Sequence, residues 1–163
     1  MEISEPRRCI IGTVGLPGDR TFYWQIAKGQ DIYSIKIEKQ QAAVIAEQID
    51  SLLDDLSDDF EIPNRKSIPT MDNDSLELPI ESQFDLVSLG VYLVNLLVQL
   101  DLKLLDSEGD SLDLRIFLTP AVAREFCARA KVVVAAGRST CPFCQLPIEP
   151  DGHICVRANG YRR

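Results

Sequence analysis

Residues 32–53 read IYSIKIEKQQAAVIAEQIDSLL, and the change of hydrophobic period inside this stretch decides the fold. From Ile32 to Glu38 apolar and polar side chains alternate in period two, which is typical of a half-buried strand. From Lys39 onward the apolar residues recur at steps of three and four, as on one face of an amphipathic helix. The stretch therefore predicts a strand that runs straight into a helix, with the helix packed on the sheet.

The segments before this stretch predict a meander of strands. Residues 9–14 are rich in β-branched side chains and residues 21–26 in aromatic ones, so both are expected to be strands. Residues 15–19 and 28–31 contain the glycine and aspartate typical of turns. Three strands therefore precede the first helix.

Residues 112–133, LDLRIFLTPAVAREFCARAKVV, show the same transition a second time. The alternating strand pattern reaches Leu118, after which Thr119 is suited to cap a helix and Pro120 to occupy its first position. The helix is expected to continue to Gly137, which can end it.

Residues 84–106 allow two interpretations. Their leucines are spaced so that an amphipathic helix is possible, but the polar residues between 99 and 103 alternate strictly with leucines. A helix would scatter that alternation around its whole circumference. We therefore predict two strands with a bend near Val94 and Asn95.

Residues 57–82 differ from both flanking parts, because they combine seven acidic residues with three prolines and show little periodicity. Such a stretch buries too little apolar surface to offset its ordering entropy, so we predict a mobile linker. The parts on either side share one order of elements, three strands and then a helix. We therefore predict an α+β domain over residues 1–137, made of two duplicated βββα units whose antiparallel sheet is covered by two helices.

Composition indicates one globular domain, since the 163 residues are 45% hydrophobic and 26% charged. Residues 1–8 are charged and contain a proline, so no signal peptide is expected. The longest uncharged run, residues 86–100, is shorter than the roughly 18–20 residues that a membrane-spanning helix needs. These features predict a soluble cytoplasmic protein without a membrane span.

Charge is unevenly distributed along the chain. Residues 1–114 hold nine basic and 22 acidic side chains, whereas residues 115–163 hold eight basic and three acidic ones. One interpretation is that the acidic linker dominates the first part and that the arginines near the end are solvated. The other is that the basic end binds an acidic surface, nucleic acid or the acidic part of its own chain.

Three of the five cysteines and the single histidine lie within the fifteen residues from Cys141 to Cys155. Cys141 and Cys144 form a C-x2-C pair, and His153 and Cys155 follow after eight residues that include two prolines and an Asp-Gly pair. Zinc takes four such N and S ligands in tetrahedral structural sites. We therefore predict a zinc-ribbon-like tail over residues 138–163, although H-x-C is a tighter second pair than most zinc sites use.

Two alternatives to zinc remain. A C-x2-C pair can be a redox site, but thioredoxin-type motifs begin a helix behind a strand, whereas two prolines follow here within six residues. The thiols could also be free in a loose tail. The other two cysteines, Cys9 and Cys127, fall on apolar patterns and are expected in the core.

Several segments at the two ends of the chain carry a family resemblance. They are Gly12–Gly15 with Pro17–Gly18 and Arg20–Phe22, Glu38–Gln41, Ala135–Arg138 with Cys141, Pro142 and Cys144, and Asp151–His153 through Cys155 to Asn159 and Gly160. Together they resemble an uncharacterised, mainly actinobacterial family of conserved hypothetical proteins, while residues 57–110 match it poorly. The resemblance implies a small soluble bacterial protein and no particular activity.

A polar cluster around the first strand-to-helix junction is a candidate ligand site. Its members are Arg20, Gln25, Glu38, Lys39, Gln40 and Gln41. Backbone N–H groups that open a helix can bind an anion, and Arg20 or Lys39 could assist. The alternative is a solvated junction with Glu38 in the favourable field of the helix N-terminus.

The end of the chain offers a second candidate, because Arg157 and Asn159 would add hydrogen-bond donors beside the metal. Such residues suit phosphate contact. The isoelectric point of about 4.6 nevertheless falls well short of a nucleic-acid-binding composition, so binding of nucleic acid is not expected.

If His153 binds zinc, no histidine remains as a general base, and the four ligands leave no open position for catalysis. We therefore predict a non-enzymatic binding or adaptor module with structural zinc, whose partner is another protein. The alternatives are an enzyme acting on a phosphorylated small molecule at the Arg20, Glu38 and Lys39 junction, or a weak nucleic-acid-binding protein.

Overall fold

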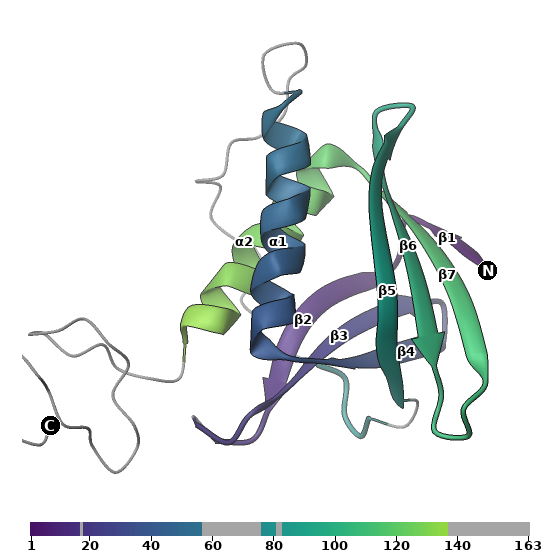
Figure 1. Cartoon of the computed structure of the whole chain (residues 1–163), viewed down its shortest axis with the longest axis vertical. Helices are drawn as coiled ribbons and strands as arrows, with labels where there is room; N and C mark the ends of the chain where they lie inside the picture. The colour runs from purple at the N-terminus through teal and green to yellow at the C-terminus, as the bar shows by residue number, and fades with distance from the viewer. Residues whose placement is uncertain (17, 57–75, 81–82, 137–163) are drawn as a thin grey trace, which may run out of the picture.

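The computed structural model describes residues 1–16, 18–56, 76–80 and 83–136, which form seven strands and two helices (Figure 1). In chain order these are β1 (Glu2–Ser4), β2 (Arg8–Val14), β3 (Thr21–Lys28), β4 (Asp31–Ile37), α1 (Lys39–Asp54), β5 (Gln83–Val94), β6 (Leu97–Leu105), β7 (Ser111–Leu118) and α2 (Pro120–Ala135). The predicted α+β class is confirmed.

The strands belong to one sheet in the order β1-β7-β6-β5-β4-β3-β2. The predicted antiparallel sheet is wrong in one respect, because β4 pairs parallel to β5 and β1 pairs parallel to β7, so the sheet is mixed. Between β4 and β5 the chain passes through α1, and such a long crossover returns it to the end where β4 began. The alternation of apolar and polar residues within a strand does not show whether the neighbouring strand is parallel or antiparallel.

The observed strands and helices confirm those predicted from the hydrophobic periodicity of the sequence. β4 passes into α1 with one residue between them, and α2 begins at Pro120 with the Thr119 hydroxyl accepting a hydrogen bond from the Val122 N–H at 3.3 Å. Residues 84–106 are two strands, as expected. The turn between them uses Asn95 and Leu96 at φ of 52° and 64°, the positive values that a tight two-residue hairpin requires.

Three strands followed by a helix occur twice, as β2-β3-β4-α1 and β5-β6-β7-α2. The two sets of strands follow one another across the sheet in the same order, with β4 beside β5. That the two sets arose by duplication of one unit remains a prediction. The short β1, which adds an edge beside β7, was not predicted because three residues are too few to show a period.

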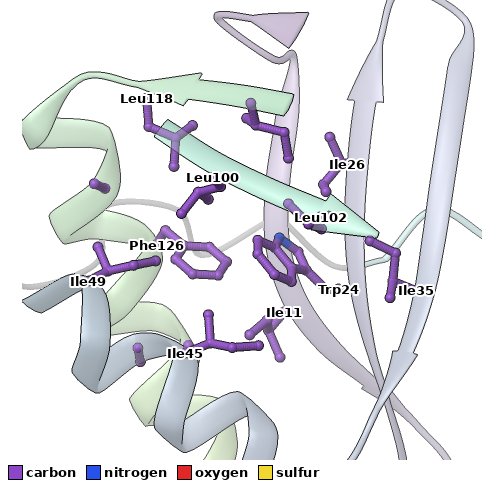
Figure 2. Close-up of a cluster of buried hydrophobic side chains, with 14 of the residues drawn as sticks. Ile11, Trp24, Ile26, Ile35, Ile45, Ile49, Leu100, Leu102, Leu118 and Phe126 are labelled. Atoms are coloured by element: carbon purple, nitrogen blue, oxygen red, sulfur yellow. The ribbon is translucent and has the colours of Figure 1, made fainter. Parts of the chain in front are cut away.

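The core lies between the two helices and the sheet face that they share (Figure 2). Trp24 on β3 is fully buried and contacts Phe126 on α2, with ring centroids 5.4 Å apart. Ile45 and Ile49 of α1 point into the same cluster from the neighbouring helix. This shared core fixes the end of β4 and the start of α1, where the predicted ligand residues lie.

A buried ion-pair network joins the helices. The Arg124 guanidinium on α2 donates to Asp50 at 2.5 Å and to Asp54 at 2.6 Å, both at the carboxyl-terminal half of α1. Lys131 also donates to Asp50. Arg124 and Asp50 are each only 2% exposed, so their charges depend on this pairing.

Residues 76–80, within the predicted linker, lie against the sheet face opposite the helices. Leu76 packs there on Ile10 and Tyr23, and the Glu77 carboxylate pairs with Arg7 at 2.6 Å. The rest of the predicted linker lies outside the described residues.

Candidate functional site

The predicted zinc ligands Cys141, Cys144, His153 and Cys155 lie outside the described residues, as do Arg157 and Asn159. Within the described part of the chain, no three His, Cys, Asp or Glu side chains are grouped so that they could hold a metal ion. The zinc site therefore stays a prediction from spacing.

The structure brings part of the predicted polar cluster together. Arg20, Glu38 and Lys39 line a hollow of about 220 Å³ at the start of α1, and Lys36 joins them. Lys36 was not predicted, although it lies two residues before Glu38, and that spacing places alternate side chains on one side of an extended segment. Three cations thus surround one carboxylate.

The groups around this hollow are already partly engaged. The Arg20 guanidinium donates to the Val133 carbonyl at 3.2 Å and lies over the Phe22 ring at 4.8 Å. Glu38 and Gln41 form a reciprocal capping box, in which the Gln41 side chain accepts from the Glu38 N–H at 2.7 Å. The junction is therefore both an ordered helix start and a small basic hollow, and the two interpretations of the sequence describe the same place.

Gln25 and Gln40 do not belong to this hollow. Gln25 is fully buried, and its amide accepts from the Glu77 N–H at 2.8 Å while donating to the Glu77 carbonyl and the Ser34 hydroxyl, each at 3.2 Å. Its role is to hold residues 76–80 on the sheet. Gln40 lies on α1 and faces a different hollow, next to β5.

That second region is an open groove between α1 and β5. β4 pairs with β5 only from Ser34 to Lys36, opposite Gln83–Asp85, because β4 ends and the chain turns into α1. A bulge between Leu86 and Ser88 follows in β5. Over residues 86–94, no strand that the structure describes pairs with this edge of β5.

α1 rises beside the unpaired edge, as Figure 1 shows. Two adjoining hollows of about 400 and 530 Å³ lie between them. They are lined by side chains from residues 40–55, in α1 and its C-cap, and from residues 86–91 of β5. We call them together the α1–β5 groove. It occupies the place that β4 would take if it continued past Ile37.

Aliphatic side chains and uncharged polar ones together line the α1–β5 groove, which is acidic at the carboxyl end of α1. Val44 and Leu89 line both hollows, and Val44 is 54% exposed although it is a large aliphatic side chain. Leu52 is half-buried and also lines the groove. The only charged residues that line the described groove are Glu47, in the middle of α1, and Asp55, its C-cap.

Sequence reasoning missed this groove. Val44 is an apolar residue outside the core stripe of α1, and that displacement is the one signal that could have pointed to it. The unpaired edge itself has no sequence signal, because an edge residue and a central residue of a strand show the same alternation.

A third hollow, of about 470 Å³, lies on the outer face of the sheet beside β5, β6 and β7. Its floor carries an ion pair in which Arg115 donates to Asp101 at 2.8 Å. This hydrogen bond lowers the pKa of the Asp101 carboxyl below its usual range. The two charges neutralise each other, so this hollow offers a ligand little net charge.

The two described cysteines are core residues, as predicted. Cys127 is fully buried, and burial raises the pKa of its thiol. Burial likewise raises the pKa of the Cys9 thiol to about 12, although the Trp24 indole N–H donates to its sulfur at 3.4 Å. Both thiols are therefore protonated at neutral pH and poor nucleophiles.

Neither described helix is long and apolar enough to cross a membrane. A family model described as "Protein of unknown function (DUF3090)" matches residues 1–155, a region that ends at the last predicted zinc ligand. No curated protein and no solved structure matches the chain.

Proposed function

The chain belongs to the family of proteins of unknown function DUF3090, and we propose that it is a non-enzymatic binding module that holds another protein in the α1–β5 groove. The observation that carries this proposal is the edge of β5 over residues 86–94, which no described strand pairs. An unpaired edge presents a row of backbone donors and acceptors to any chain that can lie beside it.

The surroundings of the edge also support binding. Proteins usually blunt an open edge with charged residues, proline, a bulge or a covering element. This edge has a bulge between Leu86 and Ser88 and lies beside α1, but residues 86–94 contain no lysine or proline, and aliphatic side chains line both the edge and the facing helix. Val44 and Val87 are both more than half exposed, at 54% and 51%. Covering them would remove apolar surface from water, which contributes about 25 cal/mol per Å².

The test of this function is a comparison of two variants with the same substitution. Val44→Lys places a charge in the α1–β5 groove, and Val132→Lys places one on the exposed side of α2, where the valine is similarly exposed at 57%. A partner isolated with the native chain from its own host should be lost with Val44→Lys and kept with Val132→Lys. Equal recovery with both variants would contradict the proposed function.

Structural zinc in the tail remains part of the proposal, supported by the spacing of Cys141, Cys144, His153 and Cys155. Protein purified without added metal should contain close to one zinc per chain, and Cys144→Ser should lower that content. Cys9→Ala changes a core cysteine instead and should leave the zinc content unchanged. Zinc-free wild-type protein would refute this part without affecting the groove.

The basic hollow at the start of α1 favours a second candidate function, the binding of a phosphorylated small molecule. Arg20, Lys36 and Lys39 supply three cations to one hollow. Inorganic phosphate should then shift the amide resonances around Lys36 and Lys39, and Lys36→Gln should weaken the shift. Shifts no larger than those caused by chloride at equal ionic strength would exclude this function.

A further inference from the structure

The shape of the α1–β5 groove limits what can bind in it. One wall is the unpaired edge of β5, and the opposite wall is α1, which packs chiefly against α2 and only lightly against β5. Since the groove continues the line of β4, the segment that fits is one that continues the sheet. Extended peptides bind other proteins in this way, through backbone hydrogen bonds to an edge strand and pockets for alternate side chains.

Resting on the proposed function, we infer that the occupant is a single extended segment of a partner protein, apolar on the side that faces α1 and carrying lysine or arginine at the end that reaches the last turn of α1. The segment pairs with β5 as an added strand. The part of β5 that lines the groove, residues 86–91, would match about six residues of it at about 3.3 Å per residue.

The apolar side of the segment follows from the groove floor. Val44, Ile45 and Leu52 from α1 and Leu89 and Val91 from β5 supply its apolar surface, between polar side chains of α1 such as Gln48 and Ser51. In an added strand every second side chain points toward the helix layer, so these positions alone need to be apolar. Alternation of apolar and polar residues is therefore the pattern expected of the partner.

The cationic end follows from the charges of the groove. Asp55 lies at the carboxyl end of α1, whereas Glu47 lies in the middle of the helix with its carboxylate 3.6 Å from the Lys131 ammonium. No lysine or arginine lines the described groove. α1 also has no basic residue in its last turn, so the negative end of its dipole adds to the Asp55 carboxylate. At the other end the groove offers the neutral Gln40 and Gln41.

A second copy of the chain fits the groove less well. Pairing two β5 strands about a twofold axis would bring both α1 helices to the same seam. It would also place the acidic ends of both grooves on one assembly whose chains each carry a net charge of -8.

The experiment is a titration of isotope-labelled protein with synthetic octapeptides, followed by the amide resonances. Two peptides alternate threonine and valine and carry two lysines at one end, acetyl-TVTVTVKK-amide and acetyl-KKTVTVTV-amide, because either strand direction is possible. Matched peptides carry glutamate in place of lysine. At least one lysine peptide should shift amides in residues 86–91 of β5 and along α1, and should bind at least about tenfold more tightly than its glutamate counterpart.

Variants decide whether the site is the groove. Val44→Lys should weaken binding of the lysine peptide at least about tenfold, since it adds like charge and bulk, whereas Val132→Lys should bind it as the wild type does. Shifts outside the groove, equal affinity for the glutamate peptides, or no effect of Val44→Lys would overturn the inference. A dimer in solution that Val44→Lys dissociates would also overturn it, because the occupant would then be a second copy.

The peptide titration and the test of the proposed function can give independent results, so a failure of this inference can be told from a failure of the proposed function. If no peptide binds but Val44→Lys still loses the native partner, the partner is not an added cationic strand and the groove remains a binding site. If Val44→Lys keeps the native partner, the groove is not its site, whatever the peptides do.

Discussion

The buried side chain of Gln25 makes the hydrogen bonds that the backbone of a neighbouring strand would otherwise make. Its amide accepts from the N–H of Glu77 and donates to the carbonyl of the same residue, which is the pattern of donors and acceptors that a neighbouring backbone would offer. The Ser34 hydroxyl accepts a further bond from it. Gln25 therefore anchors residues 76–80 to the sheet, although its residue type alone suggested a ligand site.

Gln25→Leu should destabilise the protein by about 1–3 kcal/mol, because it leaves the backbone groups of Glu77 and the Ser34 hydroxyl without their buried partner. Urea unfolding followed by Trp24 fluorescence measures this change. Gln83→Leu, at an exposed position of β5, serves as the control and should change the unfolding free energy by less than about 0.5 kcal/mol. Equal stability of Gln25→Leu and wild type would show that residues 76–80 are not held by this amide.

Glu77 adds a pH-dependent bond at the same place. The hydrogen bond from Arg7, with the charges of Arg7 and Arg8, holds the pKa of the Glu77 carboxyl below its usual value of 4.5. A lowered pKa in the folded state stabilises the protein above pH 4.5, and this contribution is lost as the pH falls through the folded pKa.

Glu77→Gln should therefore lower the urea midpoint relative to wild type at pH 7, and the difference should shrink below pH 4.5. Asp101, whose pKa Arg115 lowers in the same way, is intact in both proteins, so the difference isolates Glu77. Midpoints that stay equally far apart at pH 7 and pH 3 would contradict this assignment.

The two helices are joined by charge as well as by the core. Arg124 of α2 donates hydrogen bonds to Asp50 and Asp54 on α1. Lys131, which lies further along α2, also donates to Asp50. Ion pairs of this kind contribute little net stability when complete, but removal of one buried partner leaves a charge that water cannot reach. The network therefore fixes how α1 lies on α2, and through α1 it fixes one wall of the groove.

Arg124→Met should destabilise the protein by about 3 kcal/mol, because the buried Asp50 carboxylate would lose its guanidinium partner and keep only the partly exposed Lys131 as a cation. Lys131→Met, which removes a 40% exposed partner of the same carboxylate, should cost less than about 1 kcal/mol. Chemical unfolding of the two variants gives the comparison, and Arg124→Met with Asp50→Leu should recover part of the loss. A larger cost for Lys131→Met than for Arg124→Met would reverse the assignment of the buried pair.

Single elements could be predicted from the sequence because their signals are local. The period-two pattern of residues 32–38, the change of period at Lys39 and the Thr119-Pro120 helix start each depend on neighbouring residues. β1 could not be predicted, because Glu2–Ser4 is a strand only through its pairing with Arg115–Phe117. The parallel pairing of β4 with β5 likewise depends on where the chain returns after α1.

Of the candidate sites, likewise, one could be predicted from the sequence and the other could not. Glu38 and Lys39 could be grouped from the sequence because they are neighbours at one junction, and Arg20 joins them because β3, which begins just after it, pairs with β4. The α1–β5 groove could not, since it joins residues about 45 positions apart, such as Val44 and Leu89. Its existence depends on a difference in length between two strands, which is a property of the whole sheet.

The pairing of β5 in the sheet allows the proposed function to be tested without a ligand. β4 pairs with residues 83–85 of β5 and β6 pairs with β5 from Asp85 onward, so the two pairings overlap only at Asp85 and residues 86–94 have a described strand on one edge alone. Along a strand, alternate N–H groups point to opposite edges. In the second part of β5 every other N–H therefore points toward β6 and the remaining ones point into the α1–β5 groove.

Amide hydrogen exchange should consequently alternate between slow and fast along residues 88–94. In β6, which pairs with β5 on one edge and β7 on the other, neighbouring amides should exchange at similar slow rates, so this strand is the internal control. Binding of the lysine octapeptide should slow the fast amides of β5 and leave those of β6 unchanged, because an added strand accepts hydrogen bonds from that one edge only. Uniform protection along β5 in the free protein would mean that the edge is already covered in solution, and the groove could then not receive a partner's strand.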